Sequence, residues 1–182
     1  MSESAESNHR VSLAICVMLC LLVGFQASQA TLAGLQGWYQ TIEKPAWSLQ
    51  AWIFAPLWNV IAIFMGSALW LIWKADSTSR SKALILFAFN LVFFGAWSWI
   101  FFVFRQPLWA LICAVISSLA LILTIAAARK IKYVPALLFG CLIWGIYSSA
   151  LSYSVWKSAD LPPNAASDDI HISLDSDLPN QN

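Results

Sequence analysis

The sequence predicts an all-α membrane protein, a bundle of five transmembrane helices. Of its 182 residues, 60% are hydrophobic and only 10% are charged, which leaves too few polar groups to cover a water-soluble globule. Charged residues also divide the chain into five uncharged intervals, each close to the roughly 20 apolar residues that a helix needs to cross a hydrocarbon core. Because no water reaches the hydrocarbon and the alternation of barrel strands is absent, these intervals are expected to be helices.

The five predicted spans are bounded by Lys and Arg residues. They comprise residues 11–30, 53–73, 83–104, 108–128 and 133–156. The first span has an alternative interpretation as a cleavable signal peptide, because the apolar run is followed by the small-residue sequence Ser28-Gln29-Ala30. Cleavage there would leave four spans.

Two domains are expected from this division. Residues 1–158 form the predicted membrane domain, and residues 159–182 form an acidic tail rich in Asp, Pro, Asn and Ser. Such a composition cannot bury enough apolar surface to fold, so the tail is predicted to be disordered.

Lys and Arg residues are distributed unequally between the two ends of the predicted bundle. Seven lie at one end and three at the other: Arg10, Lys74, Arg80, Lys82, Arg129, Lys130 and Lys132, against Lys44, Arg105 and Lys157. Because such residues concentrate in cytoplasmic loops, the bias predicts a multi-pass protein with its N-terminus inside and its C-terminus outside.

The predicted spans contain no charged residue and no histidine. This argues against a proton relay, ion-coupled transport and a haem held by histidine. The four cysteines have no His or carboxylate nearby and are expected to be packing residues, so neither a metal site nor a disulfide is predicted. No catalytic constellation and no basic stripe for nucleic acid is present, and partners are sought in membrane lipid and apolar small molecules.

Tryptophan is unusually abundant, with 11 residues where about two or three would be average. Some lie near span ends, as in an interfacial belt, but four lie deeper, Trp58, Trp97, Trp99 and Trp144. Deep indoles indicate either helix packing with polar supports or an aromatic-walled ligand cavity, and the residues alone leave both open. The side chains available as hydrogen-bond donors or acceptors between helices are Asn90, Ser98, Ser148, Ser149 and Ser152.

Several motifs rich in aromatic residues follow one another along the chain at characteristic spacings. They are Trp38-Tyr39, Lys44-Pro45-Ala46-Trp47, Trp52-Ile53-Phe54-Ala55-Pro56-Leu57-Trp58, Trp97-Ser98-Trp99-Ile100-Phe101-Phe102, and Trp144 followed by Ser148-Ser149-Ala150-Leu151-Ser152-Tyr153 and Val155-Trp156-Lys157. Over about residues 20–158 this pattern resembles the translocator protein family, also called tryptophan-rich sensory proteins (TspO) or peripheral-type benzodiazepine receptors.

The resemblance implies a five-helix bundle, often a homodimer, with a cavity near the first loop that binds tetrapyrroles such as protoporphyrin IX or haem precursors, and sterols in some members. The residues in the corresponding positions are Trp38, Trp47, Trp52, Trp58, Phe94, Trp97 and Trp144. Lys44 at the mouth either pairs with a propionate or anchors the loop at the interface. Leu151, Tyr153 and Lys157 match the sterol motif, a weak pattern that also suits simple anchoring.

The chain departs from the family pattern at ligand-contacting positions. Phe94 and Ser152 each replace an Asn, Asn90 stands at a Gln position, and Ala62 replaces a Tyr, while Gly140-Cys141 replaces a Pro-Tyr pair. The expected function is an integral membrane receptor or transport protein for tetrapyrroles or similar apolar ligands, with no cofactor required and porphyrin or haem as ligand. The alternatives are light-dependent porphyrin degradation and a non-catalytic assembly protein.

Overall fold

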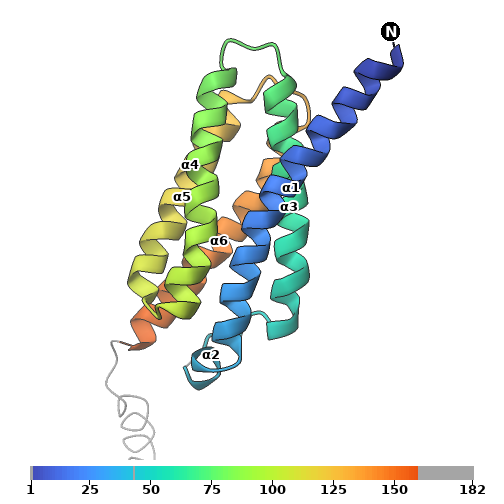
Figure 1. Cartoon of the computed structure of the whole chain (residues 1–182). Coiled ribbons are helices and arrows are strands. Elements are labelled where there is room, and N and C mark those ends of the chain that lie inside the picture. The colour runs from blue at the N-terminus through green and yellow to red at the C-terminus, as the bar shows by residue number, and fades with distance from the viewer. Residues whose placement is uncertain (1, 43, 160–182) are drawn as a thin grey trace, which may run out of the picture.

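The computed structural model describes residues 2–42 and 44–159 and is a bundle of long helices (Figure 1). The helices are α1 (Ser2–Leu35), the short α2 (Trp38–Thr41), α3 (Ala51–Lys74), α4 (Arg80–Ser98) continued by the π-helical turn η1 (Trp99–Val103), α5 (Pro107–Ala127) and α6 (Val134–Ala159). Five of the described segments are long and apolar enough to cross a membrane. The predicted fold class is therefore confirmed, while the tail predicted from residue 159 lies outside the described residues from 160 onward.

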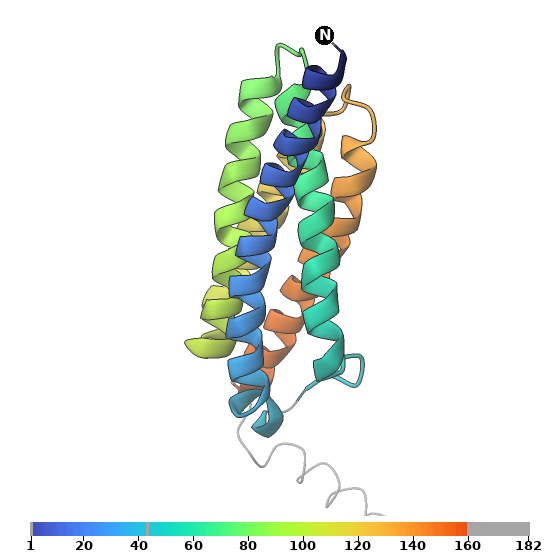
Figure 2. The ribbon, with the colours of Figure 1, turned by 45° about the vertical axis from the view of Figure 1, so that its right-hand side comes forward.

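The long helices form a closed ring in which some neighbours are distant in sequence. α1 packs on both α3 and α4, α3 packs on α6, and α5 packs between α4 and α6. Figure 2 shows α1 in front of the bundle, between α4 and α3, with α6 behind them. Side chains from widely separated parts of the chain consequently meet in one interior.

The two ends of the ring differ in what they carry. The start of α1, the loop 75–79 and the turn 128–133 lie at one end, and α2 with the segment that leads into α3 lies at the other (Figure 1). The first end therefore gathers the seven basic residues counted in the sequence. The second end carries the aromatic first loop.

The third span ends in a turn that is wider than an α-helix. The Phe104 N–H donates to the Trp99 carbonyl at 2.9 Å, five residues back, and the Gln106 N–H donates to the Ile100 carbonyl at 3.1 Å. Arg105 then takes a left-handed backbone with φ 57°, which ends the helix before Pro107 starts α5 at a position where its missing N–H costs nothing. Such π-helical turns often occur at functional sites.

Polar groups inside the bundle pair both across helices and within their own helix. The Asn90 Nδ2 of α4 donates to both the carbonyl and the Oγ of Ser117 on α5, each at 2.9 Å. The Thr31 hydroxyl of α1 donates to the Ala27 carbonyl of its own helix at 2.8 Å, and the Ser98 hydroxyl of α4 lies 3.4 Å from it. Ser148 and Ser149 instead donate to carbonyls of their own helix at 2.8 Å. Only some of the polar side chains that the sequence placed in the spans therefore form hydrogen bonds between helices.

α1 and α3 approach each other closely at Gly66. A Cβ on Gly66 would lie 2.5 Å from the Val17 Cα, which is backbone and cannot rotate away. A Cβ on Gly140, in α6, would meet only the Phe64 ring, at 3.6 Å or more. The two glycines therefore offer a matched test of close packing.

Gly66→Ala should separate α1 from α3 and lower the free energy of unfolding by about 1–3 kcal/mol, the usual range for overpacking. Gly140→Ala should leave it unchanged or slightly higher, because alanine favours the helix. Unfolding of the detergent-solubilised protein in a denaturant series measures both. Equal stability of the two variants would contradict the close approach.

Candidate functional site

Four deep aromatic side chains from three helices converge inside the bundle. Trp58 of α3, Phe94 and Trp97 of α4 and Trp144 of α6 are each no more than 8% exposed. The Trp58 ring centroid lies 4.8 Å from that of Phe94 and 5.5 Å from that of Trp144, in edge-to-face geometry. Trp97 lies 6.3 Å from both other indoles. We call these four residues the indole cluster.

A second layer of rings lies between the indole cluster and the first loop. Phe101 stacks on Trp97 with centroids 5.3 Å apart and planes at 16°, and Phe102 contacts Tyr39 of α2 at 5.4 Å. Phe54 of α3 contacts both Phe102 and Trp144 at 5.9 Å. Consecutive residues of a regular helix point in directions about 100° apart, yet Phe101 and Phe102, both in η1, are buried.

The indole cluster surrounds a small cavity of about 20 Å³. Its walls are Trp58, Phe94, Trp97, Ala114, Ser117, Trp144, Gly145 and Ser148. A space of this size holds about one water molecule. The buried Trp58 Nε1 on this wall has no hydrogen-bond partner within the described part of the chain, whereas the Trp97 Nε1 donates to the Ser152 Oγ at 3.1 Å. One lining residue, Trp58, thus carries a buried N–H donor that is not used within the described residues.

A larger groove of about 280 Å³ lies between α3 and α6, outside this cavity. Its lining is almost entirely apolar and includes Leu57, Phe64 and Ile143. Trp144 lines both the groove and the inner cavity. Trp144 is the one residue that the two linings share.

The first loop contacts Trp144 through Tyr147. The Leu49 N–H donates to the Tyr147 hydroxyl at 2.9 Å, and Trp47 packs edge-on against the Tyr147 ring at 5.7 Å. The same ring stacks on Trp144, with centroids 5.2 Å apart and planes at 26°. Tyr147 therefore connects the first loop to Trp144.

Comparison with known proteins places this arrangement in a family. The TspO/MBR family profile matches residues 16–157. The chain belongs to the TspO/MBR family. It is similar to the tryptophan-rich protein TspO of Chlorobaculum tepidum, with 34% identity over 150 residues that cover 80% of this chain and 94% of that protein. The Archaeoglobus fulgidus protein of the same description is 30% identical over 80% of this chain and 95% of its own length.

A mammalian relative extends this comparison. The chain is 31% identical to the translocator protein of Sus scrofa over 140 residues, which cover 75% of this chain and 83% of the relative. Together with the five apolar helices, membership of the TspO/MBR family makes this chain a multi-pass integral membrane protein.

The TspO/MBR bundle brings together some of the predicted site residues and separates others. The indole cluster contains four of the seven. Trp38 packs on Phe101 at 5.7 Å and Trp47 on Tyr147, so both belong to the loop side. Trp52 is 70% exposed, and its Nε1 donates to the Gln50 side chain at 2.7 Å, away from the other six.

The remaining candidates are placed as follows. The Lys44 Nζ donates to the Tyr39 carbonyl at 2.6 Å and lies over the Tyr39 ring. In the predicted sterol motif, Leu151 is fully buried, whereas Tyr153 and Lys157 are exposed. Tyr153 and Lys157 are one helical turn apart on the outer face, so a sterol there would meet these two side chains without Leu151.

Four further aromatic residues of the TspO/MBR site were not among the predicted ligand contacts. Phe54, Phe101, Phe102 and Tyr147 all pack against the indole cluster. The first three lie inside the motifs that carry the family resemblance. Their position in those motifs was the available signal, but it does not tell which face of a helix is interior.

Tyr39 closes the loop end of the second layer, and its hydroxyl is buried without a hydrogen-bond partner among the described residues. Burial, together with the nearby Tyr147 hydroxyl, raises the pKa of Tyr39 to about 12. An unfolded tyrosine ionises near pH 10. The buried neutral phenol therefore stabilises the fold below about pH 10, and this contribution is lost as the pH rises through 12.

Tyr39→Phe should make the unfolding temperature less dependent on pH between about pH 9.5 and 11.5, because the group that must ionise is gone. Thermal unfolding in detergent at stepped pH measures the effect. Tyr153→Phe is the control, since the Tyr153 ring is 47% exposed, and it should follow the wild-type curve. A Tyr39→Phe curve parallel to wild type would refute the assignment.

Ser152→Ala should lower the free energy of unfolding by about 1–3 kcal/mol, because it leaves the buried Trp97 N–H unpaired. Ser149→Ala on the same helix removes only a hydroxyl bonded to its own turn, at 2.8 Å from the Gly145 carbonyl, and should cost far less. Denaturant unfolding of both variants decides between them. An equal loss in both would show that the interhelical bond contributes nothing measurable.

Proposed function

We propose that this chain is a membrane receptor or carrier that binds tetrapyrroles, or similarly flat apolar molecules, within the helix bundle. The observation that carries the proposal is the indole cluster, whose three indoles and Phe94 line a small cavity and include the buried, unpartnered Trp58 N–H. Aromatic faces suit a flat macrocycle. A carbonyl or carboxylate oxygen of such a ligand would give the Trp58 N–H the acceptor that it lacks.

The cavity of about 20 Å³ is far below the roughly 300–1,000 Å³ of sites for ligands of this size. Binding therefore requires the rings to separate. The α3–α6 groove of about 280 Å³ joins this space once Trp144 rotates, and Trp144 is held by Tyr147 and the first loop. We propose that the loop opens, Trp144 swings out, and the ligand enters from the side of the groove.

The family comparison supports a role in sensing or transfer. Relatives carry the descriptions translocator protein and, in Cereibacter sphaeroides at 24% identity, tryptophan-rich sensory protein. The predicted spans contain no charged residue, which favours passive binding or facilitated movement over ion-coupled pumping.

Three further expectations belong to the same proposal. The excess of Lys and Arg at the N-terminal end supports an orientation with that end inside. A homodimer is expected from the family resemblance, and the shallow groove beside α1, lined by Leu91, Val92 and Ala96 among others, is the surface that we propose for it. The exposed Tyr153 and Lys157 would meet a sterol at the membrane surface.

Protoporphyrin IX should bind the purified chain and quench its tryptophan fluorescence in a saturable way. Trp144→Ala should raise the Kd by about tenfold or more, the effect of losing a central aromatic contact. Trp109→Ala is the matched control, because Trp109 lies on the lipid face and is 61% exposed. Its Kd should stay within about twofold of wild type.

Absence of saturable quenching, or equal Kd values for the two variants, would overturn the proposal. A second pair of samples, kept in light and in darkness, tests the alternative of light-dependent degradation. Loss of the porphyrin absorption only in light and only with protein present would indicate chemistry by the oxidisable indoles in place of simple binding.

A further inference from the structure

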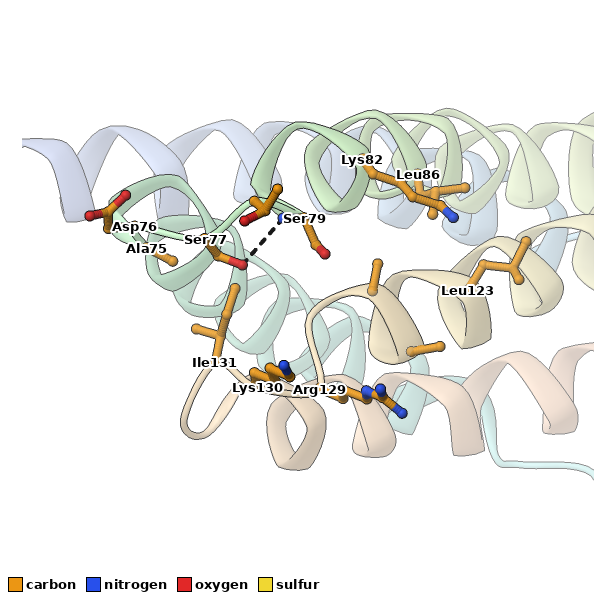
Figure 3. Close-up of a pocket in the computed structure, with 13 residues that line it drawn as sticks. Ala75, Asp76, Ser77, Ser79, Lys82, Leu86, Leu123, Arg129, Lys130 and Ile131 are labelled. Atoms are coloured by element: carbon orange, nitrogen blue, oxygen red, sulfur yellow. Dashed lines mark hydrogen bonds between the residues drawn. The ribbon is translucent and has the colours of Figure 1, made fainter.

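We infer that the basic end of the bundle carries a second site, which binds the phosphate group of an anionic phospholipid and guides its acyl chain along α4 and α5. The site lies between the loop 75–79 and the turn after α5, in a pocket of about 830 Å³ (Figure 3). It shares no lining residue with the aromatic cavity. It is therefore independent of the function proposed above.

Three cationic side chains from two parts of the chain line this pocket. Lys82 lies in the first turn of α4, and Arg129 and Lys130 follow α5. The sole carboxylate of the lining, Asp76, lies apart from them at the outer end (Figure 3). The hydrogen bond drawn in Figure 3 runs from the Ser79 N–H to the Ser77 Oγ at 3.3 Å and involves no cation. Within the part of the chain that the structure describes, no residue of the pocket lining forms a hydrogen bond or ion pair with these three cationic side chains.

Other basic residues at the same end have aromatic partners. Lys74 lies 4.9 Å from the Trp70 ring centroid, Arg80 lies 5.1 Å from that of Trp73, and Lys132 lies 4.8 Å from that of Tyr133. These rings partly compensate the positive charge. We call Lys82, Arg129 and Lys130 the pocket cations; like charges gathered without such partners favour a bound anion.

The walls of the pocket distinguish a lipid from a free anion. Leu86 lies one turn below Lys82 on the same face of α4, and Leu123 and Ala126 line the pocket from α5. Leu123 is 53% exposed on the outside of the bundle, where hydrocarbon chains lie. A soluble phosphate would not use this apolar wall, whereas a phospholipid uses both parts, as in basic pockets between transmembrane helices that hold lipid head groups.

The loop adds polar donors suited to phosphate oxygens. Ser77, Thr78 and Ser79 line the pocket, and the Ser79 side chain makes no capping hydrogen bond to α4. The first turn of α4, whose amides form the positive end of the helix dipole, therefore starts at the pocket without a side-chain cap.

Delipidated full-length protein in neutral detergent, titrated with phosphatidylglycerol and followed by native mass spectrometry, should bind one lipid in a saturable way. The variant Lys82→Gln, Arg129→Gln, Lys130→Gln should weaken this binding on the order of 100-fold, from about 1 kcal/mol per cation. The matched control, Lys74→Gln, Arg80→Gln, Lys132→Gln, loses the same three charges from the same end and should stay within about threefold of wild type.

Three results would overturn the inference. They are equal affinities of the two triple variants, phosphatidylcholine binding as tightly as phosphatidylglycerol, and glycerol phosphate displacing the lipid at equal concentration, which would indicate a free-anion site. Asp76→Asn keeps the test decisive if the pocket variant fails to fold. It removes the one carboxylate of the lining and should tighten phosphatidylglycerol binding severalfold, and unchanged or weaker binding would count against the site.

Discussion

The exclusion of water from hydrocarbon governs this protein, because every polar group inside the bundle must find its partner in the chain. The backbone meets that requirement by forming helices. Among side chains, Asn90 bonds to Ser117 and Trp97 to Ser152, each joining two helices. Four buried polar atoms of the described residues lack a partner: the Tyr39 hydroxyl, the Trp58 Nε1, the Asn90 Oδ1 and the Ser118 Oγ. Trp58 is the informative one, because it also lines the aromatic cavity.

The same constraint explains why aromatic rings fill the interior. They supply large contact areas without charge, and most of the close pairs here are edge-to-face or tilted, arrangements that rings prefer to a face-to-face sandwich. A ligand with flat faces replaces one set of ring contacts by another.

Much of the fold could be predicted from charge spacing, because a span tolerates no charge and the boundaries at Lys74 and Pro107 are visible in the sequence. The site was harder. Trp52 and Trp58 belong to one motif, yet six helical residues turn the second about 240° from the first, so one lies outside and the other in the core. The π-helical turn has no recognisable sequence signal, and it is this turn that accompanies the burial of both Phe101 and Phe102.

Tyr147 contacts both the first loop and the indole cluster, because its hydroxyl accepts a hydrogen bond from the Leu49 N–H and its ring stacks on Trp144. Thermodynamic linkage requires that such coupling be reciprocal. If a ligand in the bundle loosens the first loop, then any partner that recognises the loosened loop must strengthen ligand binding by the same factor. A single tyrosine would in this way connect occupancy of the interior with the surface of the membrane.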